Sequence, residues 1–171
     1  QSPNVPPTKP VPRLAQVAVL FNADSPSSPL QLQAMEATAR SLKVTLHKFP
    51  VRGPHEVDNA FAAAVKTRVG AVALGDDPMF INNPKLIAEL AIKRGLPAAG
   101  SSGFADGGGL MSYGANFRGM FHRAATFVDK IFKGTKAGDI PIEQAMRFET
   151  IVNLKTAKAL GIKIPNVVMV R

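Results

Sequence analysis

The sequence contains no cysteine, so disulfide bonds, thiolate chemistry and cysteine-rich zinc sites are excluded. It also has no apolar run that approaches the roughly eighteen residues needed for a membrane-spanning helix. No charged start leads into an apolar segment in the manner of a signal peptide. The pattern is the one expected of a mature or truncated soluble chain.

Acidic residues are scarce relative to basic ones: 12 Asp and Glu stand against 21 Lys and Arg, which gives a net charge of +9. Such a charge favours an anionic partner on composition alone. The basic residues are nevertheless scattered singly, with no arginine-rich block, no RNA-binding aromatic signature and no zinc-finger spacing. We therefore expect solvated helix faces and no nucleic-acid partner, with a polyanion-binding module as an alternative.

The length and hydrophobic content of the chain limit how many domains it can form. A chain of 171 residues with 46% hydrophobic content is long enough for one α/β domain with its own core. The opening segment, residues 1–13, is rich in proline and is expected to form an extended arm or linker. Residues 14–171 are then expected to form a single lobe.

Short apolar runs alternate with amphipathic helical patterns along most of the chain. The runs predicted to be strands are residues 16–22, 44–51, 71–76, 96–102 and 109–114. Several of the helical patterns between them have a proline at or near the start, at Pro29, Pro54 and Pro84. This alternation predicts an α/β fold with a mainly parallel open sheet of about five strands and helices on both faces, as in Rossmann-like folds.

The segment 116–133 has the pattern of a long helix with an unusually wide apolar arc. Such a helix needs apolar partners on nearly two sides, whereas one lobe offers a single surface. We expect Phe117, Phe121 and Phe132 to leave an exposed apolar patch. A second copy of the chain would cover it in a homodimer, by exchange of this helix. The alternative is that the helix packs on its own sheet.

Ligands of open parallel sheets gather at the carboxyl ends of the strands, so the loops there are the candidate site. Their hydroxyl, amide and carboxylate groups suit the charged groups of an amino-acid-like ligand. Local turn and cap formation is the alternative role for the loop residues, and gap filling is the alternative for the single tyrosine. The candidate ligand-binding residues are Asn22, Ser25, Asp77, Ser101, Ser102 and Tyr113.

Patterns typical of catalysis are weak. There is no Gly-x-Ser-x-Gly elbow, and His47, His55 and His122 have no ligand spacing, so we assign no catalytic residue, metal ligand or cofactor. A carboxylate after the third predicted strand, at Asp76 or Asp77, is also typical of a phospho-accepting receiver domain. A receiver-like sensor domain is therefore a further alternative, although no acidic pair follows the first strand.

Two segments near the end of the chain carry a family resemblance: GGGLMSYG, residues 107–114, and ETIVNLKTAKALGIKIP, residues 149–165. Together with VPRLAQVAVLFN and KGTKAGDIPIEQAMRFE, they resemble the periplasmic substrate-binding proteins of ABC importers, of the tryptophan/tyrosine type. The resemblance runs from about Val11 to Ile164 and covers only the second half of a family member.

The resemblance implies a type I periplasmic-binding-protein lobe with no enzymatic activity. It implies a carboxyl-terminal ligand-binding lobe that delivers a small amino-acid-like or aromatic solute to an ABC permease and its ATPase in the periplasm. The amino-terminal lobe is a further expected partner, and in such proteins the segment resembling 116–133 crosses to that lobe and returns. Since one lobe supplies about half of the ligand contacts, we expect weak binding by this chain alone.

Overall fold

The computed structural model describes residues 14–143 and 147–166. The strands are β1 Gln16–Asn22, β2 Thr45–Val51, β3 Ala71–Leu74, β4 Ala98–Gly100, β5 Met111–Ala115 and β6 Phe148–Val152. The helices are α1 Ser28–Ser41, α2 Val57–Lys66, α3 Pro78–Ile81, α4 Pro84–Lys93, α5 Phe117–Phe132 and α6 Leu154–Ala159. Two 3-10 turns are η1 Pro54–Glu56 and η2 Ala137–Asp139. The proline-rich segment 1–13, predicted to be an arm, lies outside the described residues.

All six strands form one sheet in the order β2-β1-β3-β4-β5-β6. The first five are parallel, which confirms the mainly parallel open sheet predicted from the alternating pattern. β6 is added at the edge beside β5 and runs antiparallel to it. It extends the predicted sheet of about five strands by one strand.

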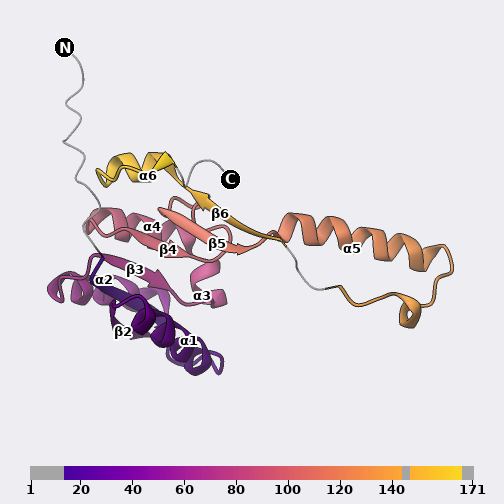
Figure 1. The fold of residues 1–171 in the computed structure, drawn as a ribbon, viewed down its shortest axis with the longest axis horizontal. Helices are drawn as coiled ribbons and strands as arrows, with labels where there is room; N and C mark the ends of the chain where they lie inside the picture. The colour runs from indigo at the N-terminus through magenta and orange to yellow at the C-terminus, as the bar shows by residue number, and fades with distance from the viewer. Residues whose placement is uncertain (1–13, 144–146, 167–171) are drawn as a thin grey trace, which may run out of the picture.

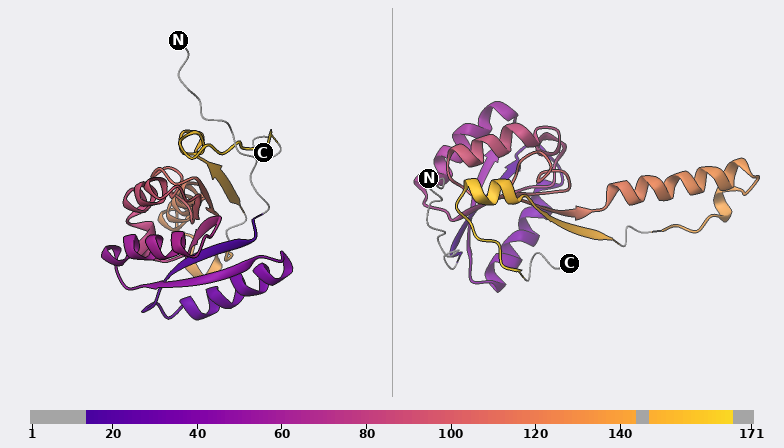
Figure 2. Two further views of the ribbon diagram at one scale, coloured as in Figure 1. Left: turned by 90° about the vertical axis from the view of Figure 1, so that its left-hand side faces the viewer. Right: turned by 90° about the horizontal axis from the view of Figure 1, so that it is seen from above.

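Helices cover both faces of the sheet, as predicted (Figure 2). On one face Ala18 and Leu20 of β1 pack into a buried cluster with side chains of α2 and α4. On the other face Val17 lies in a groove beside α1. Successive side chains of a strand point to opposite faces, so this split follows from the period of the strand.

The main core lies between the sheet and the pair α2 and α4. Phe61 of α2 is fully buried there, and Ile87 of α4 is 1% exposed. Both helices present small residues, such as Ala64 and Ala88, to the same interface, which lets them lie close to the sheet. After α4, Gly95 adopts a left-handed backbone (φ 65°) that ends the helix before β4.

Helix α5 projects from the lobe as an arm, beyond the carboxyl end of β5 (Figure 1). Asn116 caps the helix, since its side-chain oxygen accepts a hydrogen bond from the Gly119 backbone N–H at 2.6 Å. No residue of α5 is buried. The alternative in which this helix packs on its own sheet is therefore wrong.

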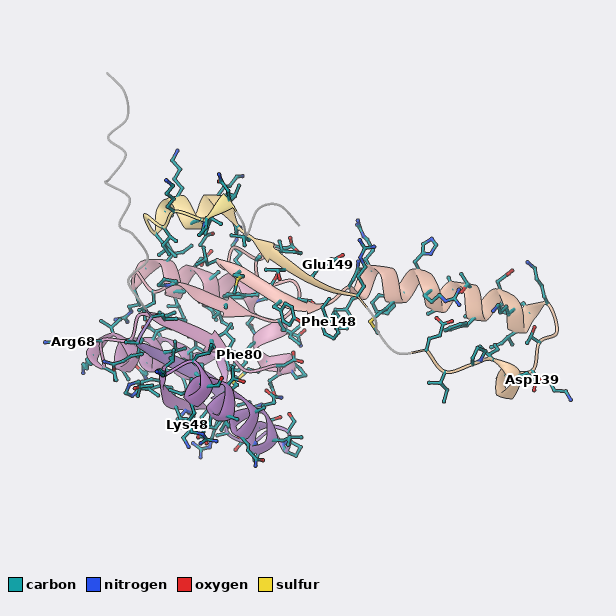
Figure 3. The ribbon with its side chains drawn as sticks, in the orientation of Figure 1. Lys48, Arg68, Phe80, Asp139, Phe148 and Glu149 are labelled. Carbon is teal, nitrogen blue, oxygen red and sulfur yellow. The ribbon has the colours of Figure 1, made fainter. Side chains whose placement is uncertain are left out.

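The chain returns along α5 after the turn η2 (Figure 3). An ion pair between Arg123 and Glu143 ties the returning segment to the helix. The Arg123 guanidinium lowers the pKa of the Glu143 carboxyl, and the Glu143 carboxylate raises the pKa of Arg123. Arg123 also lies over the ring of Phe127, 5.0 Å from its centroid. Both contacts leave the opposite side of α5 uncovered.

Candidate functional site

A hollow of about 440 Å³ lies at the carboxyl ends of β3, β4 and β5. We call it the rim hollow. Its volume is within the range of small-molecule sites, and its position is the one where open parallel sheets bind ligands. The lining side chains with polar or aromatic groups are Asp76, Ser101, Ser102, Tyr113, Phe117 and Phe148.

Ser101 and Ser102, both predicted as site residues, line the rim hollow from the loop after β4. The Ser102 hydroxyl donates a hydrogen bond to the Ala115 carbonyl at 2.8 Å, which fixes this loop against β5. Gly114 makes that approach possible, because a Cβ there would lie 3.0 Å from the Ser102 backbone nitrogen and closer still to its hydroxyl. The polar wall of the hollow is therefore held in place by β5.

Tyr113, the third predicted residue that lines the rim hollow, leaves 60% of its surface exposed. Its ring stacks on Phe148 of β6, with centroids 5.8 Å apart and planes 20° from parallel. The two residues are diagonal neighbours, because Tyr113 pairs with Thr150 and Phe148 pairs with Ala115. Figure 3 places Phe148 where the arm leaves the lobe. The hollow thus has an aromatic wall beside its polar one.

Phe148 was not among the predicted site residues, and Phe117 was assigned to the dimer patch. Phe117 begins α5 and is half exposed beside the hollow, at the base of the arm. Both aromatic side chains reach the hollow because the chain leaves and re-enters the lobe there. The sequence of this strand, FETIV, does not alternate between apolar and polar residues, so no local pattern placed Phe148 in the site.

Asn22, Ser25 and Asp77 do not line the rim hollow; they hold the neighbouring loops together. The Asn22 side-chain amide donates to an Asp77 carboxylate oxygen at 3.1 Å, and that oxygen also accepts the Met79 backbone N–H at 2.9 Å. Asp77 is therefore the cap of α3, and it is 6% exposed. Ser25 shares a hydroxyl contact of 3.1 Å with Ser27 at the start of α1. These contacts favour the structural role of all three residues.

We expect Asp77→Ala to lower the free energy of unfolding by about 1 kcal/mol, because α3 loses its cap. Solute binding should stay unchanged, since Asp77 does not line the rim hollow. Urea unfolding followed by circular dichroism measures the effect, and Asp77→Asn is the matched control because asparagine also caps helices. An equal loss of stability in both variants would contradict the capping role.

Asp76, next to the cap, lies at the rim hollow with its side chain exposed. Gln31 of α1 holds its backbone: the Gln31 amide donates to the Asp76 carbonyl at 2.9 Å and accepts its N–H at 3.0 Å. A fixed backbone with a free-standing carboxylate suits a ligand ammonium group. Asp76, rather than Asp77, is therefore the acidic residue of the hollow.

In residues 14–143 and 147–166 no group of three or more His, Cys, Asp or Glu is arranged to hold a metal ion. His47 makes a contact of 2.9 Å with the Gln16 side chain and is partly buried, so it is a structural residue. Within the same part of the chain no helix has the length and apolar character needed to cross a membrane.

Comparison with known proteins identifies the family. A model of the family described as ABC transporter substrate binding protein matches residues 7–171. A "Tyrosine-binding protein" of Clostridioides difficile (strain R20291) is 20% identical over 153 residues, which are 89% of this chain and 44% of that protein. The chain belongs to the ABC transporter substrate binding protein family, as the resemblance implied.

Solved structures agree on the fold. A conserved domain protein from Vibrio cholerae has a TM-score of 0.78 at 19% identity, covering 94% of this chain and 54% of its own. An ABC domain in complex with L-Trp from Streptococcus pneumoniae has a TM-score of 0.75 at 21% identity, covering 92% of this chain and 55% of its own. The chain thus spans about half the length of these relatives. With the family established, we propose neither the receiver-like nor the polyanion-binding alternative.

Proposed function

We propose that this chain is the carboxyl-terminal ligand-binding lobe of a periplasmic solute-binding protein of an ABC importer. Its solute is a small aromatic or amino-acid-like molecule. The observation that carries the proposal is the rim hollow, where a Tyr113–Phe148 stack faces strand-end hydroxyl groups. The tyrosine named for one relative and the L-Trp bound by another are of the same chemical class.

Each wall of the rim hollow has a role in this proposal. The exposed ring of Tyr113 stacks on the aromatic part of the solute. The hydroxyl groups of Ser101 and Ser102 bind its polar part, and the Asp76 carboxylate binds its ammonium group. The lobe carries out no chemistry on the solute.

Binding in the two-lobed protein proceeds by closure of the lobes around the solute. The amino-terminal lobe desolvates the other side of the ligand, and the closed form is the one that the permease and its ATPase engage. One lobe alone buries about half of the ligand. We therefore expect the isolated chain to bind with a Kd of about 1 mM or weaker, equivalent to about −4 kcal/mol.

A further proposed partner is a second copy of the chain, through the patch that includes Phe117, Phe121 and Phe132. These side chains are 50%, 75% and 85% exposed. Phe117 also lines the rim hollow, so the patch and the ligand site are continuous.

We expect Tyr113→Ala to abolish the measurable binding of L-tyrosine and L-tryptophan, because the exposed aromatic wall is lost. Isothermal titration at millimolar solute measures the effect. Ser25→Ala is the control, since Ser25 lies outside the rim hollow and its variant should bind as the unmodified chain does. Equal binding by the Tyr113→Ala variant and the unmodified chain would contradict the aromatic role of the hollow.

A further inference from the structure

The loop after β4, residues 101–109, brings Ser101 and Ser102 to the rim hollow before the chain enters β5. It is a compact turn. The Phe104 N–H donates to the Ser101 carbonyl at 3.2 Å, and the Gly109 N–H donates to the Phe104 carbonyl at 2.8 Å. Phe104 is 4% exposed, and a Cβ at Gly109 would overlap its ring. The loop is therefore a packed unit, so a displacement at its far end is transmitted to the two serines.

The segment that follows β6 holds the far end of this loop. The Asn153 side-chain amide donates a hydrogen bond to the Ala105 carbonyl at 2.9 Å. One helical turn later, the Thr156 hydroxyl donates to the Gly108 carbonyl at 2.7 Å. Thr156 is 5% exposed, so its hydroxyl depends on a protein partner more than on water. We call these two hydrogen bonds the α6 clamp.

The α6 clamp is itself fixed to the sheet. The Asn153 N–H donates to the Leu110 carbonyl at 2.9 Å, which continues the β5–β6 ladder. The Asn153 side-chain oxygen caps α6 by accepting the Thr156 N–H at 3.0 Å. At the other end of β6, Phe148 stacks on Tyr113 in the aromatic wall. Figure 1 shows β6 leading from the base of the arm to α6. One strand thus joins the aromatic wall to the clamp on the loop of the polar wall.

We propose that Asn153 and Thr156 are positioning residues of the rim hollow, which fix the distance between its polar wall and its aromatic wall. Neither residue lines the hollow, so both act through the loop 101–109. A loop that is already held in place presents its hydroxyl groups to a solute without being ordered on binding, which strengthens the complex. The attachment of the loop to α6 stands on the contacts alone, whereas its effect on affinity rests on the proposed function.

Two conservative substitutions remove the clamp. Thr156→Val keeps the branched shape of the side chain and removes its hydroxyl donor. Asn153→Ser keeps a good helix cap but loses the amide that donates to Ala105. Thr156→Ser restores a hydroxyl and serves as the rescue. The matched control is Thr67→Val, because the Thr67 hydroxyl also donates to a backbone carbonyl, that of Ala63 at 2.9 Å, but at the end of α2.

Amide signals of the full chain without solute, in nitrogen–proton correlation spectra, test the attachment of the loop. We expect the signals of Ser101 and Ser102 to move in Thr156→Val and to move further when Asn153→Ser is added. Thr156→Ser should return them toward their original positions, and Thr67→Val should leave them in place. Unchanged serine signals in the double variant, or equal changes in the control, would overturn the proposal.

Titration of the same variants with L-tryptophan tests the effect on binding. We expect the double variant to bind about fivefold more weakly than the unmodified chain, because its serine side chains must then be ordered on binding. Thr156→Val alone should weaken binding in the same direction, and Thr67→Val should not. A purely structural role would lower the urea midpoint and leave the affinity unchanged, and that result would reject positioning.

The positioning role and the proposed function fail separately. An unmodified chain that responds to L-tryptophan at the hollow, together with a double variant of equal affinity, keeps the proposed function and rejects the positioning role. An unmodified chain whose hollow signals do not respond rejects the solute site and with it any role of the clamp in binding. In that case the solute-free signals of Ser101 and Ser102 still decide whether α6 holds the loop.

Discussion

Replacing Phe61 by alanine is expected to lower the free energy of unfolding of the chain by about 3–5 kcal/mol. Phe61 lies on α2 and is fully buried in the core that α2 and α4 form with the sheet. It is the largest of the completely buried side chains described. The variant loses the transfer free energy of the ring and leaves a cavity that its neighbours fill only in part.

Urea unfolding measured by circular dichroism provides the comparison. The midpoint should fall while the slope of free energy against urea stays constant, since the surface exposed on unfolding is nearly unchanged. Leu30→Ala on α1 is the control, because Leu30 is 74% exposed and its variant should stay within about 0.5 kcal/mol of the unmodified chain. A loss at Phe61 no larger than that of the control would place the core elsewhere.

Gly114→Val is expected to lower the free energy of unfolding by about 1–3 kcal/mol, through overpacking against the loop after β4. A Cβ at this position would lie 3.0 Å from the Ser102 backbone nitrogen, and backbone cannot move aside as a flexible side chain can. The hydrogen bond from the Ser102 hydroxyl to the Ala115 carbonyl should break. The polar wall of the rim hollow would then shift away from the aromatic wall.

Two readouts separate this local effect from general damage to the fold. Urea unfolding reports the stability, and the amide signal of Ser102 in a nitrogen–proton correlation spectrum reports the loop. Gly138→Val is the matched control, because a Cβ there meets nothing within 4 Å. An unchanged Ser102 signal in the Gly114→Val variant would show that the loop does not depend on β5.

Much of the lobe follows from local sequence. β1 spans Gln16–Asn22 as predicted, since its apolar residues are buried on both faces of a central strand. Proline near the start of a helix was an equally reliable signal at α4, which begins at Pro84. These signals act within a few residues and do not depend on the rest of the fold.

The candidate site was only partly predictable, because residue type does not separate a ligand contact from a structural contact. Asn22 and Asp77 have the right side chains at the right strand ends, yet they bond to each other and to the start of α3. Ser101 and Ser102 look less specific in sequence and do line the hollow. Phe148 enters the site through the register of β6 on β5, which is set by contacts far apart in the chain.

The amide chemical shifts of the chain, followed during titration with L-tyrosine or L-tryptophan, test most directly whether the rim hollow is a solute-binding face. Aromatic rings shift nearby amide signals strongly, so even weak binding is visible at high solute concentration. We expect the signals of Ser102, Tyr113 and Phe148 to move together and L-alanine to shift them less. Shifts confined to residues outside the rim hollow, or none at the solubility limit of either solute, would contradict a solute-binding lobe.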